Sequence, residues 1–560
     1  MATIRTLLSE AYAQSPSRIA VRWKANKTWH DWKFGDVYAR ARAVAEVLGD
    51  LGVKPGDRVA LMMENRPEWI ATYLGITCCG ITAVPIDAKL QPHEVSHIMR
   101  DSEAVSFIGS GHVWNLLREV EADLPKLRTA VMLDGVVADD FRDNDVHHYD
   151  YETLIQKLGG ESASADSYFD RNVARETDVA SIIYTSGTTG RSKGAMLTHA
   201  NFLAQMAALD YFTVTAEDNF LLVLPLHHAF AFTACLLVPL RRQCEVSMVE
   251  SLRTIPENMR ECKPSVLLAV PLLAEKMLDG ILKKLRKSAA ARILMGMGLT
   301  RVIGKKVIEA LGGKLRIIVC GGAASDPAML KSWNKFGVKT LEGYGLTETA
   351  PISALAPEND IRLGSVGKAL PGHELRIADP NEEGIGEIEV KGPSVMKGYF
   401  RNEDATKECF DGDWFRTGDL GKLDPDGYLT ITGRKKSLIV NREGKNIYPE
   451  EVELVLNDCP HILESLVLGY HVPGEVKGEH VGAIVVPDIE KFTQERRASA
   501  ASPLSDDEIK KICLDEVHEA VKALSTYKHP RRLQVRMEPF MKTNTLKIKR
   551  YLYSLDSEEG

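Results

Sequence analysis

The segment Thr185–Gly194 reads TSGTTGRSKG and directly follows the apolar run Ser181–Tyr184. Its glycines let backbone N–H groups approach an anion closely, and its Thr and Ser hydroxyls add further hydrogen-bond donors. Lys193 adds a positive charge. This combination of residue types predicts a loop that holds the phosphate groups of a ligand.

The spacing within this loop differs from that of the P-loop found in many kinases and GTPases. The P-loop has the pattern G-x4-G-K-[ST]. Here Gly187 and Gly190 precede Lys193, and Gly194 stands where the P-loop has Ser or Thr. A kinase or GTPase assignment therefore fails at this loop, and the alternative to a phosphate site is a surface loop without a ligand.

The elements that position this loop can be read from the apolar pattern. From about residue 35 to 360, apolar strand-like runs alternate with amphipathic helical stretches. This alternation predicts βα units and parallel sheet. The expected buried strands are Val59–Leu61, Thr82–Pro85, Ser181–Tyr184, Val246–Val249, Ser265–Val270 and Leu315–Cys320.

The pattern changes twice further along the chain. Between 362 and 432, short alternating runs such as GEIEVKG are broken by Gly and Asp, which favours a small antiparallel sheet or barrel. A compact α/β pattern then continues to the end. We therefore expect an α/β protein with a large N-terminal domain at 1–432, which includes a β-barrel-like subdomain at about 362–432. A hinge at 433–440 and a mobile C-terminal domain at 441–560 complete it.

Composition limits the function classes. The chain has 560 residues, too many for one core, and its net charge of -7 does not indicate a nucleic-acid binder. Its nine cysteines show no CxxC spacing, which argues against a disulfide framework or a structural zinc site. No secretory segment and no apolar run long enough to span a bilayer is present. The sequence predicts a cytoplasmic protein of several domains with small-molecule partners.

Five segments occur in an order that resembles the adenylate-forming superfamily of acyl-CoA synthetases, carrier-protein adenylation domains and luciferases. They are the loop TSGTTGRSKG, followed by Thr198-His199, and the segments Glu342–Glu348, Arg416–Asp419, Gly433-Arg434 and Gly444–Glu453. The stretch GVKPGDRVALMMENRPEWIATYLG is also family-like, so the resemblance covers most of the chain. The AMP-forming acyl-CoA synthetases, and among them the fatty-acyl branch, are the most similar group.

This resemblance implies a reaction in two steps. A carboxylate attacks the α-phosphorus of ATP to give an acyl-adenylate and pyrophosphate, and the thiol of coenzyme A then displaces AMP. Mg²⁺ assists, and the acid is expected to be apolar: fatty, aromatic or alicyclic. The same site could run in reverse to make ATP. Two alternatives stay open, namely a ligase that loads a separate carrier protein and a nucleotide-binding regulator without turnover, although Lys547 and Glu348 speak against the regulator because binding alone needs neither.

The resemblance also implies roles for individual residues around the nucleotide. Glu348 and Thr185 are expected to hold Mg²⁺, since both offer hard oxygen ligands, and Thr347 to donate to the α-phosphate. A solvated helix-cap acid is the alternative for Glu348. The remaining nucleotide-binding positions are Ser186, Gly187, Thr188, Thr189, Gly190 and Lys193 for the phosphates, Gly322, Ala323, Gly343 and Tyr344 for the adenine, Asp419 for the ribose, and Arg434 for the ribose or the phosphates.

His228, Ala231 and Gly321 are expected to line the acyl pocket. The pair His227-His228 also invites interpretation as a metal site. Neighbouring side chains diverge along a strand, however, and no carboxylate or cysteine stands at ligand spacing, so we favour a pocket-lining role. Ala231 replaces a glycine often found in the family, which could narrow the acyl tunnel.

The C-terminal domain is expected to carry the catalytic lysine. Lys542–Arg550 occupies the place of the family's PxTxxGK segment, and Lys547 falls on the lysine that bridges the attacking carboxylate and the phosphate. Leu546 and Asn544 depart from the usual Gly and Pro. Lys436 falls on the hinge residue, and Gly444 on the tunnel for coenzyme A.

The stretch 281–316 is strongly basic. It carries ten Lys or Arg residues against a single acid, Glu309, with the apolar run ILMGMGL between them. Such a pattern could give weak peripheral contact with an anionic membrane. The alternative is a pair of solvated basic helices.

Overall fold

The computed structural model describes residues 2–137, 141–143, 145–159, 167–185, 192–287, 300–323, 325–441, 443, 445–472, 478–499, 501–542 and 547–555. The chain separates into two compact units. The first is formed by Met1–Leu375 and Val390–Phe415, and the second by Arg376–Glu389 and Arg416–Gly560. Each unit has its own buried apolar core.

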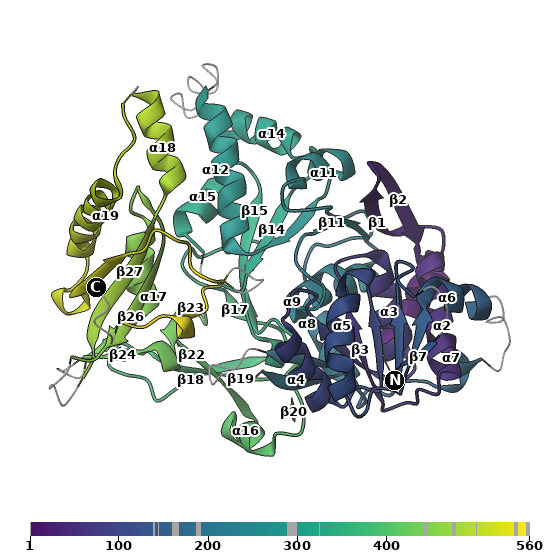
Figure 1. Cartoon of the computed structure of the whole chain (residues 1–560). Helices are drawn as coiled ribbons and strands as arrows, with labels where there is room; N and C mark the ends of the chain where they lie inside the picture. Colours follow the sequence, from purple (N-terminus) through teal and green to yellow (C-terminus); the bar gives the residue numbers. More distant parts are fainter. Residues whose placement is uncertain are drawn as a thin grey trace. The chain divides into compact units, whose positions relative to one another are not determined.

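One sheet of the first unit carries the candidate phosphate loop. Its strand order is β20-β10-β9-β4-β3-β5-β6-β8-β7, with a parallel centre and antiparallel pairs β9–β10, β10–β20 and β7–β8. Helix α3 packs against β3 and β4 (Figure 1). The strands are β3 (Arg58–Met62), β4 (Thr82–Ile86), β5 (Ser106–Gly109), β6 (Thr129–Met132), β7 (Phe141–Asp143), β8 (Val146–Asp150), β9 (Val179–Thr185), β10 (Lys193–Thr198) and β20 (Gly398–Tyr399).

The second sheet of this unit has the order β17-β16-β15-β14-β13-β11-β12-β1-β2. Strands β1 and β11–β15 pair in parallel, and the outer strands β2, β16 and β17 pair antiparallel. The strands are β1 (Ile19–Ala25), β2 (Thr28–Lys33), β11 (Asn219–Leu222), β12 (Glu245–Met248), β13 (Val266–Ala269), β14 (Ile317–Gly321), β15 (Lys339–Tyr344), β16 (Ala354–Leu355) and β17 (Lys368–Ala369).

Helices cover these two sheets. Helices α12 and α15 contact β14 and β15, and α9 continues through a π-helical turn, Thr233–Leu237, into α10. The helices are α1 (Ile4–Gln14), α2 (Phe34–Asp50), α3 (Pro67–Cys78), α4 (Pro92–Ser102), α5 (Trp114–Val120), α6 (Tyr151–Gly159), α7 (Tyr168–Arg171), α8 (His199–Ala208), α9 (Ala229–Phe232), α10 (Val238–Arg242), α11 (Ile255–Cys262), α12 (Pro271–Lys287), α14 (Thr300–Ala310), α15 (Pro327–Lys335) and α16 (Glu403–Glu408).

A five-stranded sheet comprises β18 (Glu374–Ala378), β19 (Gly386–Lys391), β21 (Phe410–Asp411), β22 (Trp414–Leu423) and β23 (Leu429–Arg434). The pairs β21–β22 and β22–β23 are antiparallel, and the boundary between the units falls within these strands. The second unit also contains β24 (Ile439–Val440), β25 (Asn446–Ile447), β26 (Ile462–Tyr470), β27 (His480–Pro487), β28 (Arg532–Val535), α17 (Pro449–Asn457), α18 (Ile489–Ala498) and α19 (Asp506–Ala520).

The predicted fold class is confirmed. Each of the six apolar runs expected to form a buried strand overlaps an observed strand, and in the region that begins at 362 the strands β21, β22 and β23 form antiparallel pairs. Within the described ranges, no helix combines the length and the apolar character needed to cross a membrane.

Candidate active site

Two antiparallel strands hold the ends of the candidate phosphate loop side by side. β9 ends at Thr185, β10 begins at Lys193, and the two residues are partners in the register. The loop residues Ser186, Gly187, Thr188, Thr189 and Gly190, expected to contact phosphates, lie outside the described residues. The structure thus places Thr185 and Lys193, the two described residues at the ends of this segment, side by side.

Glu348 lies beside these loop ends on a short 3-10 turn, Thr347–Thr349. Its Oε1 accepts a hydrogen bond from Thr185 Oγ1 at 3.3 Å and another from the hydroxyl of Tyr399 at 2.9 Å. The side chain is buried, so it is not a solvated helix-cap acid. A carboxylate and a hydroxyl at a phosphate loop fit Mg²⁺, which is usually held by one or two carboxylates together with water and substrate phosphates.

Tyr399 completes this group, although no sequence pattern had singled it out. It lies on β20, which pairs with β10 just beyond Lys193. The ammonium of Lys193 lies 5.2 Å from the centre of the Tyr399 ring. Burial and the negative charge of Glu348 raise the pKa of the Tyr399 hydroxyl, so the hydroxyl is a hydrogen-bond donor at neutral pH. No local signal could have found this contact, because it depends on pairing between distant segments.

The carboxyl ends of β14 and β15 form a surface with little side-chain bulk. Gly321 and Gly343 are partners in the parallel register. Gly322 has φ +86°, a conformation that favours glycine. A Cβ atom on Gly345 would lie 1.9 Å from the carbonyl oxygen of Pro351. Ligands of open α/β sheets bind at such strand ends, which suits the adenine contacts expected of Gly322, Ala323, Gly343 and Tyr344.

His227 and His228 lie in a turn before α9, with ring centres 4.2 Å apart. The expectation that they diverge along a strand is therefore wrong. His227 Nε2 lies 3.4 Å from Oδ2 of Asp87, directly after β4. Asn65 holds the same loop, since its Nδ2 donates to the carbonyl of Leu224 at 2.9 Å. Asp87 and Asn65, which follow two strands of one sheet, thus hold the turn that carries His227 and the candidate acyl-pocket residue His228, and neither was expected from the sequence.

Ala231 and Phe230, which follow His228 in the sequence, lie in different surroundings. Ala231 is fully buried within the core. Phe230 instead reaches the end of β14, where its Cζ lies 3.3 Å from the position that a Cβ on Gly321 would occupy. An aromatic ring therefore lies beside Gly321, which gives this strand end an apolar surrounding.

In the second unit, Asp419 and Arg434 lie opposite each other on β22 and β23. Arg434 Nε donates to Asp419 Oδ1 at 2.7 Å, and Asp419 is buried. Nearby protein that displaces water lowers the pKa of the Lys547 ammonium, Arg434 lowers it further, and Asp419 opposes both. The three expected residues of this unit therefore form one electrostatic group. Lys436 lies on the exposed 3-10 turn Lys435–Ser437, and Gly444 lies outside the described residues.

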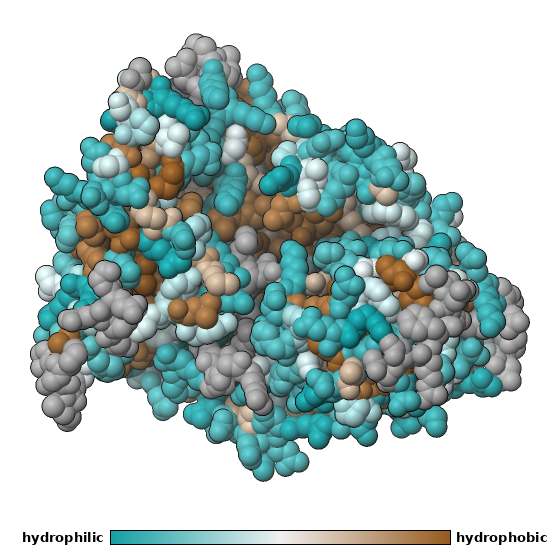
Figure 2. All heavy atoms as spheres, viewed as in Figure 1, coloured by the Kyte–Doolittle hydropathy of each residue, from teal (hydrophilic) through white to brown (hydrophobic). Residues whose placement is uncertain are grey.

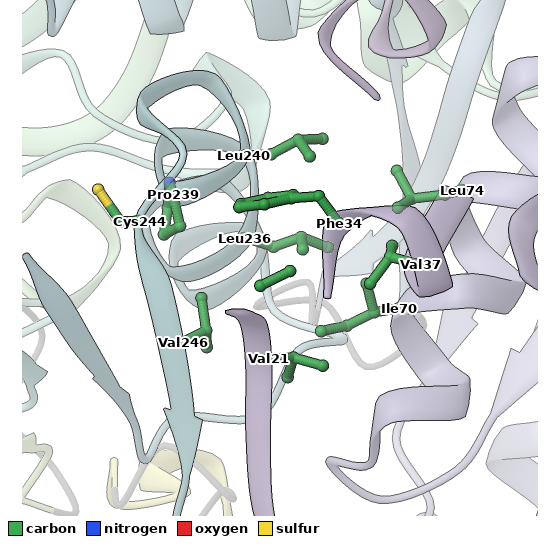
Figure 3. Close-up of a pocket in the computed structure, with 11 residues that line it drawn as sticks. Val21, Phe34, Val37, Ile70, Leu74, Leu236, Pro239, Leu240, Cys244 and Val246 are labelled. Carbon is green, nitrogen blue, oxygen red and sulfur yellow. The ribbon is translucent and has the colours of Figure 1, made fainter. Parts of the chain in front are cut away.

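A separate cavity in the first unit is lined by apolar residues (Figure 3). Its volume is about 20 Å³, whereas substrate pockets usually occupy roughly 300–1,000 Å³. It cannot hold a substrate as it stands, and we assign it to the core. Its lining comes from β1, α2, α3, the π-helical turn, α10 and β12, and includes Val21, Phe34, Ile70, Leu236, Leu240 and Val246.

Comparisons with known proteins identify the family of this chain. The family model "AMP-binding enzyme" matches residues 8–400. The long-chain-fatty-acid–CoA ligase FadD15 of Mycobacterium bovis is 30% identical over 98% of this chain and 94% of its own. The chloroplastic long-chain-fatty-acid–[acyl-carrier-protein] ligase AEE15 of Arabidopsis thaliana is 29% identical over 80% of this chain and 71% of its own.

A solved structure gives the same result for the fold. ATP-bound MatB from Rhodopseudomonas palustris is 27% identical and superposes with a TM-score of 0.76, covering 98% of each chain. The family match spans more than half of the chain, and FadD15 matches along nearly its whole length. This chain therefore belongs to the AMP-binding enzyme family of the adenylate-forming superfamily and is an AMP-forming acid–thiol ligase.

Proposed function

We propose that this protein activates an apolar carboxylic acid with ATP and transfers the acyl group to the thiol of coenzyme A, releasing AMP and pyrophosphate. The arrangement around Glu348 supports this proposal most directly. A buried carboxylate beside a phosphate loop would repel a triphosphate, so its position is explained by a cation that binds between them. Adenylation chemistry requires such a cation, whereas a loop that only binds phosphate does not.

In the first step, an oxygen of the acid attacks the α-phosphorus, and the bond to the leaving pyrophosphate breaks. Lys193 and the donors of its loop hold the β- and γ-phosphates, and Thr347 donates to the α-phosphate. When bound, Mg²⁺ would be held by Glu348 and Thr185 and would neutralise phosphate charge. Lys547 places its ammonium between the acid and the α-phosphate, where negative charge develops.

Two further assignments complete the nucleotide site. Asp419 accepts the ribose hydroxyls, because a carboxylate can accept two hydrogen bonds at once, and Arg434 holds that carboxylate in place. In the second step the thiol attacks the acyl carbon and AMP leaves. We expect the domain at 441–560 to rotate about Lys436 between the two steps. Lys547 would then leave the reacting groups, and the coenzyme A tunnel at Gly444 would take its place beside them.

The acid is proposed to be apolar, and a fatty acid is the first choice. Two observations support this: Phe230 packs beside Gly321 at the proposed acyl site, and FadD15 is named for long-chain fatty acids. His228, Ala231 and Gly321 belong to the same proposed acyl-binding region. A separate carrier protein is the alternative acceptor. Similarity to AEE15 favours it, since that relative is named as an acyl-carrier-protein ligase.

We also propose a cytoplasmic enzyme that contacts anionic membranes weakly. Lys283, Lys284 and Lys287 are exposed on α12, as are Lys305 and Lys306 on α14. Figure 2 shows hydrophilic residues over much of these two helices. Residues 288–299, which include the apolar run, lie outside the described part. Sedimentation with anionic vesicles should show binding at low salt and loss at high salt, and absence of binding at low salt would reject the contact.

One assay tests the reaction itself. The protein is incubated with MgATP and a panel of acids of graded length and ring content, with either coenzyme A or a phosphopantetheinylated carrier protein as acceptor. The proposal expects AMP, pyrophosphate and a new thioester of coenzyme A. Formation of ADP would refute adenylation, a thioester only on the carrier would select the alternative acceptor, and no nucleotide turnover would indicate a regulator.

A further inference from the structure

Tyr399 contacts two of the groups to which ATP binding is assigned in the first unit. Its hydroxyl donates to Glu348 Oε1 at 2.9 Å, and its ring lies 5.2 Å from the ammonium of Lys193. The same carboxylate oxygen accepts from Thr185 at 3.3 Å. Tyr399 therefore connects Lys193, at one end of the phosphate loop, with the proposed metal ligand Glu348, which also contacts Thr185 at the other end.

The backbone around Tyr399 is held firmly enough to act as a support. Its N–H donates to Thr406 Oγ1 at 2.9 Å, and the N–H of Phe400 donates to the carbonyl of Gly194 at 2.8 Å. The N–H of Met396 donates to the carbonyl of Glu348 at 2.8 Å. A single segment thus holds both the backbone and the carboxylate of Glu348, and it is fastened to the strand that leaves the loop.

The hydrogen-bond pattern is suited to a carboxylate that must also bind a cation. Both bonds from Thr185 and Tyr399 end on Oε1. A metal ion can be coordinated by the other oxygen, Oε2, without displacing either donor. Residues that orient a metal ligand in this way commonly change metal affinity by about 10–100-fold when they are altered.

We propose that Tyr399 is a positioning residue whose hydroxyl orients Glu348 for the divalent cation that accompanies ATP, while its ring places Lys193 beside the same phosphates. The inference rests on the proposed function, because it assumes that ATP binds at this loop. In this arrangement Tyr399 couples two positions, that of the cation and that of the Lys193 charge. Neither the phosphate loop nor the metal ligand has this role alone.

The test measures binding rather than turnover. ATP affinity is determined by equilibrium dialysis in EDTA and again across a Mg²⁺ titration, for the wild-type protein and for Tyr399→Phe, which keeps the ring but loses the hydroxyl. Tyr184→Phe is the matched control, because it removes a phenol that donates to Asp101 at 2.6 Å near the same loop. Circular dichroism confirms that each variant is folded.

The proposal expects Tyr399→Phe to raise the Mg²⁺ concentration for half-maximal ATP binding by roughly tenfold, the scale of one hydrogen bond to a charged group. Affinity in EDTA should stay unchanged, and Tyr184→Phe should follow the wild type. Glu348→Gln should remove the Mg²⁺ effect, and adding Tyr399→Phe to it should change nothing more.

Other results would overturn the inference. If Tyr399→Phe weakens binding equally with and without Mg²⁺, the residue shapes the loop and not the cation site. If it changes neither, or if its effect adds fully to that of Glu348→Gln, the two residues are not coupled. A wild-type protein that binds no ATP under any condition would reject the proposed function as well, so the two failures are distinguishable.

Discussion

Replacing Lys547 by Ala should separate the two half-reactions. In the proposed first step, this ammonium faces negative charge on the α-phosphate and the attacking carboxylate. A unit charge pair about 4 Å apart is worth roughly 4 kcal/mol at the effective dielectric constant of about 20 that suits protein surfaces. Loss of one charge-stabilising group from an active site typically costs about 10²–10³-fold in rate. We therefore expect adenylation, measured by exchange of labelled pyrophosphate into ATP, to fall by at least roughly 10²-fold.

The second half-reaction provides the control. Lys547→Ala should still convert supplied acyl-adenylate into acyl-CoA at close to the wild-type rate. Equal loss in both half-reactions would refute the assigned role. The environment of Lys547 adds a pH signature, because the surrounding protein and the charge of Arg434 lower the pKa of its ammonium. Adenylation should decline on the alkaline side at a lower pH than for an ordinary lysine, and Lys547→Arg, which stays charged, should move that decline upward.

Three further predictions concern stability. Burial raises the pKa of Glu342 from 4.5, the ordinary pKa of a glutamate, to about 7. The folded protein therefore loses stability as the pH rises from 4.5 toward 7. Glu342→Gln should raise the thermal midpoint at pH 8 but not at pH 5, by the equivalent of about 3 kcal/mol. Burial lowers the pKa of His199 to about 4, so about 3 kcal/mol should be lost as pH falls from about 6.5 to 4, and calorimetry of His199→Gln should show a flatter acid limb. Gly345→Ala should reduce the midpoint severely, because its Cβ would overlap Pro351, whereas Gly280→Ala, with open space around it, should be neutral or stabilising.

The sequence predicted those parts of the molecule that depend on local pattern. Apolar runs such as Ser181–Tyr184 became buried strands because each is flanked by turn residues and is too short for a buried helix. The segment TSGTTGRSKG could be predicted as a phosphate loop from its residue types alone. Thr185, at one end of this loop, hydrogen-bonds with Glu348 in the structure, while their role as metal ligands stays a prediction. Asp419 and Arg434, predicted to share the ribose, are cross-strand partners.

What the sequence could not predict depends on contacts between distant segments. Tyr399 reaches Glu348 only because β20 pairs with β10, across about two hundred residues of chain. Asp87 reaches His227 because the end of β4 meets the loop before α9. The strand assumed for His227 and His228 failed for a local reason: Pro225 and the turn after it end the extended run that begins at β11. Apolar character alone does not show where a strand stops.

The negative charge of Glu348 distinguishes an adenylating enzyme from a nucleotide-binding module better than the number of phosphate contacts does. A module that only binds nucleotide gains affinity from every positive or neutral group and loses it with each carboxylate. Here a carboxylate is buried beside Thr185, and Tyr399 supports it with a hydroxyl. The repulsion between this carboxylate and the phosphates is useful under two conditions. A cation must neutralise it during the reaction, and the charged pyrophosphate must leave afterwards. Glu348→Gln should accordingly bind metal-free ATP more tightly than the wild type while losing adenylation, a combination that no purely binding role would produce.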